Sequence, residues 1–174
     1  MSALTDIYSK WTQAANEGET TAAILYDLSA AFDCVDSAVL CRKLKHYGFS
    51  AKATEWFRSY LTKQKQVTSV GSTMSRTADV LMGSPQGSLL LPVIFIILMG
   101  DIDLWTEHSF TFGFADDTSS SCSGDDFEEV LNNLEQDAEH ILLFMASNCL
   151  VMNPEKTGFL VHRPNLQEFP PIHH

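Results

Sequence analysis

Three aspartates stand where a compact fold would bring carboxylates together. Asp27 is near the end of the apolar stretch Thr21–Leu28, and Asp116 and Asp117 separate two short stretches typical of β-strands. If these strands are neighbours in a sheet, the carboxylates approach closely. Two carboxylates about 4 Å apart repel by roughly 4 kcal/mol at an effective dielectric near 20. Such a cluster therefore needs a compensating cation, usually a divalent metal ion.

The chemistry that these carboxylates favour is phosphoryl transfer. Their hard oxygens suit Mg²⁺ or Mn²⁺, and two such ions about 4 Å apart can hold the attacking and leaving oxygens of an in-line displacement. No Lys or Arg lies between Arg76 and Lys156 to neutralise the charge locally. Alternatives remain open: an Asp-Asp pair in a turn is commonly solvated, and Cys34, Cys41 and His46 could form a different metal set.

The elements that must position these residues can be read from hydrophobic periodicity and turn residues. The spacing predicts helices over 4–15, 36–47, from Ser50 through Leu61, over 88–102 and over 124–146. The third is expected to have Trp56, Phe57, Tyr60 and Leu61 as its apolar face, and the fourth is expected to be buried. Strands are predicted over 21–28, 65–70, 73–81, 110–114, 118–122 and 158–162. This order predicts an α+β fold, with a small, mainly antiparallel sheet and helices packed on one face.

Composition and length fit one soluble globular domain. The chain has 174 residues, of which 45% are hydrophobic and 19% charged, values ordinary for a globular protein. Its longest apolar run, Leu89–Met99, contains Pro92 and is shorter than the roughly 20 residues of a membrane span. The N-terminus lacks the pattern of a secretory signal. We therefore expect no membrane association, four free cysteines and an intracellular location, nuclear or cytoplasmic.

The charge is strongly polarised along the sequence. The net charge is −11, yet eight of the eleven Lys and Arg residues lie between Arg42 and Arg76. An acidic segment follows, up to Glu155. The overall charge argues against a general nucleic-acid binder, because binding to phosphates depends on basic side chains. The basic segment could still contact a phosphate backbone on one side of the molecule.

Four short segments follow one another along the chain: Asp27–Asp33 (DLSAAFD), Gly83–Ser88 (GSPQGS), Phe114–Asp117 (FADD) and Asn153–Thr157 (NPEKT). In this order they resemble the palm motifs of reverse transcriptases from non-LTR retrotransposons. Each is weak alone, but four in order with suitable spacing are specific. The resemblance covers almost the whole chain, and it implies a polymerase palm over 1–163 and a proline-rich tail over 164–174 that we expect to fray.

The resemblance also implies the metal site. Asp27 and Asp116 match the two metal-bridging carboxylates, Asp117 matches a supporting ligand, and the carbonyl of Leu28 matches a further ligand position. Two Mg²⁺ ions, or Mn²⁺, are the cofactors implied. Lys156 matches the basic residue near the leaving pyrophosphate, where it could donate a proton or neutralise charge.

The substrates follow from the same resemblance: an RNA template, a DNA primer and a deoxynucleoside triphosphate (dNTP). Phe32 matches the aromatic residue beneath the incoming sugar, where a bulky ring would leave no room for a 2′-hydroxyl, although it could simply pack in the core. Pro85, Gln86 and Gly87 match the nucleotide and template pocket. The residues expected to contact the nucleic-acid backbone are Lys52, Arg58, Lys63, Lys65 and Arg76.

The resemblance leaves parts of the enzyme without a counterpart here. Basic residues of the fingers, expected upstream of Asp27, and a thumb, expected after residue 163, do not match any segment of this sequence. We therefore expect this isolated chain to be inactive as a processive polymerase. A catalytically inactive retroelement remnant or interaction module with a palm-like fold is the main alternative. A palm-fold nucleotidyl cyclase is disfavoured by Pro85–Ser88 between the carboxylate segments.

Overall fold

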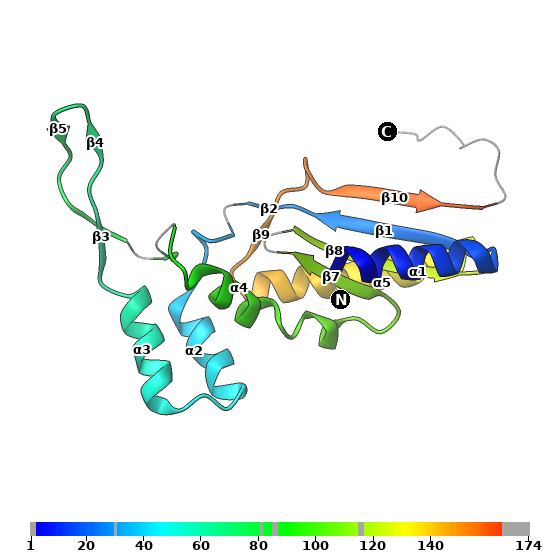
Figure 1. Cartoon of the computed structure of the whole chain (residues 1–174), viewed down its shortest axis with the longest axis horizontal. Coiled ribbons are helices and arrows are strands. Elements are labelled where there is room, and N and C mark those ends of the chain that lie inside the picture. Colours follow the sequence, from blue (N-terminus) through cyan, green and yellow to red (C-terminus); the bar gives the residue numbers. More distant parts are fainter. Residues whose placement is uncertain (1–2, 30, 81, 85–86, 115–116, 165–174) are drawn as a thin grey trace. The chain divides into compact units, whose positions relative to one another are not determined.

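The computed structural model describes residues 3–29, 31–80, 82–84, 87–114 and 117–164. The chain divides into two compact units. The sheet unit comprises Met1–Asp27, Ile102–Phe144 and Met152–His174, and the helical unit comprises Leu28–Asp101 and Met145–Val151. Figure 1 gives the order of the elements along the chain.

The sheet unit is built on four antiparallel strands in the order β10-β1-β8-β7. Their bounds are Thr20–Tyr26 for β1, Phe110–Phe114 for β7, Asp117–Gly124 for β8 and Gly158–His162 for β10. The central pair β1 and β8 is in register from Thr20 opposite Gly124 to Tyr26 opposite Thr118. The prediction of a small antiparallel sheet is confirmed, including the bounds of β7 and β10.

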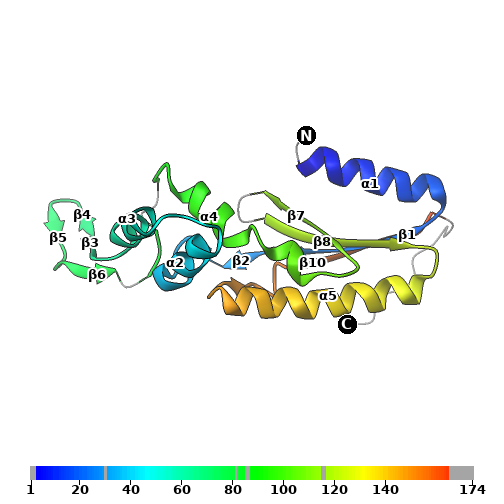
Figure 2. The same ribbon diagram turned by 90° about the horizontal axis from the view of Figure 1, so that it is seen from below.

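Two helices cover this sheet, one on each face (Figure 2). α5 (Phe127–Ser147) packs on the face that carries Ala22 and Cys122, through Val130 and Leu134. α1 (Ala3–Glu17) lies over the opposite face, where the Trp11 indole donates a hydrogen bond of 2.9 Å to the Ser121 hydroxyl. Side chains alternate between faces along a strand, so Ser121 and Cys122 point to opposite helices. The α+β fold is thus confirmed, with α1 as an addition on the second face.

A buried carboxylate joins α5 to the chain entering β7. Asp137 is 0% exposed and accepts backbone N–H groups of Glu107, His108 and Ser109 at 2.9, 2.9 and 2.5 Å. Burial alone would raise the pKa of Asp137, but these hydrogen bonds outweigh burial and lower it. The sequence interpretation missed this residue, although it occupies a core position in the helical spacing of Val130, Leu134 and Ile141.

The helical unit packs three helices around one apolar core. α2 (Ser37–His46), α3 (Ala51–Leu61) and α4 (Leu91–Met99) contribute its buried side chains. That core consists of Val35, Val39, Leu40, Leu44, Phe57, Leu61, Ile94 and Leu98. Helix starts follow the expected capping chemistry: Asp36 accepts the N–H groups of Ala38 and Val39, both at 2.8 Å.

A two-stranded ribbon follows α3 in the helical unit (Figure 1). β3 (Gln64–Gln66) pairs with β6 (Ala78–Val80), and β4 (Ser69–Val70) pairs with β5 (Thr73–Met74). The predicted hairpin around Gly71 is confirmed, but each of its two predicted strands is observed as two shorter strands. The short strands β2 (Leu28–Ser29) and β9 (Val151–Met152), which also pair, were not predicted.

Two apolar helices are less buried than their sequences indicate. The run predicted as a buried helix over 88–102 forms α4 and then a separate 3₁₀ turn, η1 (Ile102–Trp105). Only one side of α4 is buried, since Val93 and Ile96 are exposed. In α3, the predicted apolar face included Trp56, which is instead half exposed. None of the helices in the described parts of the chain is long and apolar enough to cross a membrane.

Candidate active site

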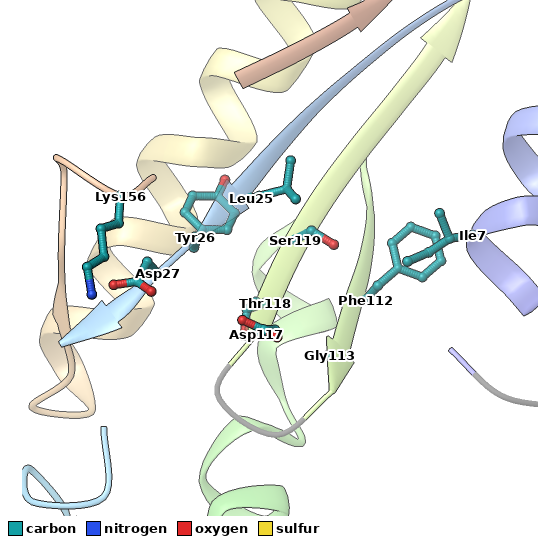
Figure 3. Close-up of a pocket in the computed structure, with 10 residues that line it drawn as sticks. All are labelled: Ile7, Leu25, Tyr26, Asp27, Phe112, Gly113, Asp117, Thr118, Ser119 and Lys156. Carbon is teal, nitrogen blue, oxygen red and sulfur yellow. The ribbon is translucent and has the colours of Figure 1, made fainter. Parts of the chain in front are cut away.

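A cavity of about 500 Å³ opens at the end of the sheet where β1 stops and β8 begins. It lies within the sheet unit, and Figure 3 shows the side chains around it. Its lining comes from α1, β1, β7, β8 and the turn before β10: Ile7, Leu25, Tyr26, Asp27, Phe112, Gly113, Asp117, Thr118, Ser119 and Lys156. Three of these residues, Asp27, Asp117 and Lys156, were predicted as site residues from the sequence.

Asp27 directly follows the last residue of β1 and is half-buried. Its backbone is attached to the turn that carries Lys156. The Asp27 carbonyl accepts the N–H of Asn153 at 2.8 Å, and the Asp27 N–H donates a longer hydrogen bond of 3.5 Å to the Thr157 hydroxyl. That hydroxyl donates to the Asn153 carbonyl at 2.8 Å. The segment Asn153–Thr157 is therefore held against the residue it is expected to assist.

Lys156 is exposed and lies beside Asp27 at the cavity (Figure 3). The turn that presents it is closed by its own hydrogen bonds. The Asn153 carbonyl accepts the N–H of Lys156 at 3.3 Å and that of Thr157 at 3.0 Å, while the Asn153 side chain accepts the N–H of Glu155 at 3.1 Å. Such local closure is typical of an Asn-Pro turn, and it presents the ammonium group on a defined backbone.

Asp117 is the first residue of β8 and is exposed at the cavity. The register of β1 and β8 ends with Tyr26 opposite Thr118, so the adjoining residues Asp27 and Asp117 lie at the same end of the sheet, where both line the cavity. Figure 3 shows both carboxylates at this end of the sheet. Asp116 lies outside the described residues, so its predicted place beside them stays a prediction.

The donor set around this cavity fits a hard divalent cation. Asp27 and Asp117 offer carboxylate oxygens to a solvent-open space, and Mg²⁺ is commonly bound by one or two carboxylates with waters and substrate phosphates filling the remaining positions. Among the described residues, no group of three or more His, Cys, Asp or Glu residues could hold a metal ion by itself. The two carboxylates are therefore an open site that needs further ligands.

The remaining predicted residues for nucleotide binding belong to the helical unit, where the segments around Phe32 and Gly83 are joined. The Phe32 carbonyl accepts the Ser84 N–H at 3.0 Å, and the Val35 carbonyl accepts the Gly83 N–H at 2.9 Å. Gly83 has φ +98°, and an added Cβ would lie 3.0 Å from the Asp33 backbone. Only glycine fits this close approach without strain.

The side chain of Phe32 packs within the helical unit. Its ring meets that of Phe95 edge to face, with 5.5 Å between centroids and an angle of 68°. Of the neighbouring predicted residues, Gly87 has φ +78°, whereas Pro85 and Gln86 lie outside the described residues. Leu28, a predicted ligand through its carbonyl, is the buried first residue of β2.

A second cavity of about 500 Å³ lies between the ribbon and the Gly83 segment of the helical unit. It is lined by Asp33, Gln64, Lys65, Gln66, Val80, Met82, Gly83 and Ser84. Its walls carry a lysine and two amides, and the Ser84 hydroxyl is buried with no hydrogen-bond partner among the described residues. The sequence singled out Lys65 but not Gln64 or Gln66, because an amide in an exposed strand gives no distinguishing signal.

The basic residues predicted to contact nucleic acid are exposed, on α3 and on the ribbon after it. Lys52, Arg58, Lys63, Lys65 and Arg76 all have solvent-exposed side chains. Arg58 differs from the others because it pairs with Glu55 at 2.8 Å. Its charge is locally compensated, which makes it a weaker candidate for a phosphate contact.

Comparisons with known proteins identify the family of the chain. The family model described as "Reverse transcriptase (RNA-dependent DNA polymerase)" matches residues 2–167. No curated protein matches the sequence.

Solved structures of telomerase have a similar fold. The telomerase of Candida albicans, in complex with a fragment of telomeric RNA, matches 94% of this chain with a TM-score of 0.65 and 14% identity. The apo telomerase of Candida tropicalis, truncated from its C-terminal domain, matches 93% with a TM-score of 0.66 and 13% identity. The chain spans 31% and 36% of these two proteins, so their similarity bears on the fold alone.

Proposed function

The chain belongs to the reverse transcriptase (RNA-dependent DNA polymerase) family, and we propose that it forms the catalytic palm of such an enzyme. The reaction is transfer of a nucleotide from a dNTP to the 3′-hydroxyl of a DNA primer on an RNA template. The observation that carries this proposal is the cavity that gathers Asp27, Asp117 and Lys156 from distant parts of the sequence. Residues 1–163 are proposed as one palm-like domain of a non-LTR retrotransposon enzyme.

Asp27, Asp116 and Asp117 are proposed to hold two Mg²⁺ or Mn²⁺ ions, together with the Leu28 carbonyl. When bound, the ions would stabilise the charge that develops on the attacking and leaving oxygens. The protein supplies the rest: Asp27 is fixed by the hydrogen bond from Asn153 to its carbonyl. The triphosphate supplies the ligands that the two described carboxylates lack.

Lys156 is proposed to act on the leaving group. Its ammonium lies beside Asp27 at the same cavity, on a turn held to the Asp27 backbone. From there it could neutralise the leaving pyrophosphate or donate a proton to it. Both roles require a cation that reaches the phosphates, which an exposed lysine on a short turn can provide.

The helical unit is proposed to bind the other substrate groups. Phe32, Pro85, Gln86 and Gly87 are assigned to the incoming nucleotide, and the second cavity, with Lys65, to the template strand. Lys52, Lys63 and Arg76 are assigned to phosphates of the template and primer, because each is exposed and without an ion pair among the described residues. Arg58 is retained as a minor contact, given its pairing with Glu55.

Single-nucleotide addition tests the proposal. A labelled DNA primer annealed to RNA is mixed with excess full-length chain, one complementary dNTP and Mg²⁺ or Mn²⁺. We expect the parent chain to add one nucleotide and Asp27→Asn to be slowed by at least about a hundredfold, since removing a group that stabilises transition-state charge commonly costs this much. Asp125→Asn, an exposed acid outside the cavity, should react like the parent. Equal rates for Asp27→Asn and the parent would refute the assignment.

A further inference from the structure

One face of α3 carries two large aromatic rings, the half-exposed Trp56 and Tyr60, which is partly buried against the core of the helical unit. The buried side of this helix consists of Thr54, Phe57 and Leu61. Trp56 is 51% exposed, and its ring lies nearly parallel to that of Tyr60, with 6.0 Å between centroids and an angle of 12°. An exposed, flat aromatic surface of this kind is available to stack on another ring.

The rings of this face are held in place from behind. The buried Phe57 meets Trp56 edge to face at 5.1 Å and 87°, and the Tyr60 hydroxyl donates a hydrogen bond to the Ser88 hydroxyl. The carbonyl of Tyr60 also accepts the Gln64 side-chain amide at 2.6 Å. A fixed ring loses little conformational entropy when a ligand stacks on it, which favours binding.

Two lysines lie on either side of the two rings in the sequence, Lys52 before them and Lys63 after them. Lys52 precedes Trp56 by four residues, so the two lie on the same side of the helix about one turn apart. Lys63 follows the helix in a left-handed backbone conformation, φ 61°, and both lysines are exposed. The nearby Glu55 is paired with Arg58. Among the described residues neither Lys52 nor Lys63 has an ion pair, so both can offer a positive charge to a ligand in a protein whose net charge is −11.

We propose that this α3 stacking face, formed by Lys52, Trp56, Tyr60 and Lys63, binds single-stranded nucleic acid. One base stacks on Trp56, and the phosphates on either side of it contact the two lysines. Aromatic stacking with flanking cations is how proteins hold unpaired strands without reading sequence, because every base has a flat face. The inference rests on the proposed function in one respect, since a polymerase must hold an unpaired template strand.

Comparing the affinity of the full chain for a normal strand and for an abasic strand distinguishes base stacking from phosphate contacts. The probes are a fluorescently labelled oligo(U) and an abasic oligonucleotide of equal length, measured by anisotropy at fixed salt. We expect the parent chain to prefer oligo(U) about tenfold, which corresponds to roughly 1.4 kcal/mol for one stacked base. Trp56→Leu should abolish this preference, and Trp56→Phe should retain part of it.

Two further variants control the measurement. Tyr8→Leu removes an exposed aromatic from α1 and should leave the preference for oligo(U) unchanged. Replacing Lys52 and Lys63 by Gln should lower the affinity for both probes by the same factor, because only phosphate contacts are lost. Thermal melting of Trp56→Leu checks its fold, and Trp56→Phe supplies a second, milder variant of the same ring.

The outcomes are distinct. An equal affinity of the parent for both probes, or an unchanged preference in Trp56→Leu, would overturn the inference. Absence of oligonucleotide binding by the parent would overturn it too, and would favour a protein partner for this face. Asp27→Asn should keep the full preference for oligo(U) while losing nucleotide addition. If Asp27→Asn reacts like the parent, the proposed function fails and the α3 stacking face stands.

Discussion

Asp27 and Asp117 line the same cavity because the register of β1 and β8 ends with Tyr26 opposite Thr118, the residues that adjoin them in the sequence. We predict that Mn²⁺ binds the parent chain weakly without nucleotide, since the substrate supplies several ligands. Replacing both Asp27 and Asp116 by Asn should abolish this binding. Water-proton relaxation during an Mn²⁺ titration measures it, with Asp125→Asn as the control. Equal Mn²⁺ binding by the double variant and the parent would contradict the metal assignment.

Two possible roles of Phe32 can be distinguished by experiment. Its ring packs against Phe95, as a core residue would, while the family resemblance assigns it to exclusion of the ribonucleotide 2′-hydroxyl. If it excludes ribose, Phe32→Val should raise ribonucleotide use and largely keep deoxynucleotide addition, because the smaller side chain leaves room. If it only packs, the variant should lose about 2 kcal/mol of stability and slow both substrates alike. The ratio of kcat/KM for the two sugars decides.

At the level of single residues, the sequence allowed part of the candidate site to be predicted. Asp27, Asp117 and Lys156 carry recognisable chemistry inside ordered motifs, and the structure brings them to one cavity. The hydrogen bonds from Asn153 and to Thr157 that fasten this turn to Asp27 could not be predicted. They join residues more than a hundred positions apart, and neither local spacing nor composition reports such a contact.

Among the elements, prediction succeeded where one face was clearly apolar and failed where the decisive contact was tertiary. β10 and β7 were predicted with their observed bounds, because short apolar runs between turn residues favour strands. Trp56 was assigned to a buried face on hydrophobicity alone, although Phe57 and Leu61 fill that place. Asp137 was missed because a carboxylate in a helix is ordinarily solvated. The three N–H groups that make burial of Asp137 possible come from a loop that is distant in the sequence.

Asp137 should be a principal contributor to stability of the sheet unit. Asp137→Asn replaces one accepting oxygen by an N–H₂ group that faces N–H donors, and it removes the charge. Hydrogen bonds to a charged group contribute about 2 kcal/mol, so we expect the midpoint of thermal unfolding to fall by roughly 4–8 °C. Glu139→Gln, an exposed acid on the same helix, should leave the midpoint unchanged. An equal midpoint for Asp137→Asn and the parent would show that these bonds are dispensable.

The same carboxylate predicts a pH dependence. Its pKa is lowered in the folded state from an ordinary value of 3.8, so the folded state favours the ionised form. Its contribution is then fully present above the unfolded pKa and is lost as the pH falls below about 4 through the folded pKa. Urea unfolding at pH 7 and at pH 3 should show a larger loss on acidification for the parent than for Asp137→Asn. Equal losses would indicate that other carboxylates govern acid unfolding.

For the molecule as a whole, the distribution of charge decides how strongly it can hold a duplex. Eight of the eleven Lys and Arg residues fall in 42–76, within the helical unit. Of these, Arg58 pairs with Glu55, and Lys43 pairs with Asp101. The six that remain are all exposed, and four of them, Lys52, Lys63, Lys65 and Arg76, are the ones assigned to nucleic acid, whereas Arg42 and Lys45 are not. If template and primer are held by only these four cations, they should dissociate readily, particularly as the salt concentration rises.

We therefore predict that this chain alone does not extend primers processively. With about four phosphate contacts, the logarithm of the binding constant should fall with the logarithm of salt concentration at a slope of roughly −3 to −4. Primer extension on poly(A)/oligo(dT), started together with a trap that captures dissociated protein, should give products only one or a few nucleotides longer than the primer. Lys63→Gln should reduce the salt slope by about one, and Asp125→Asn should not change it. Products tens of nucleotides long in the presence of the trap would contradict the prediction, because they require tighter binding to the template–primer duplex than four phosphate contacts provide.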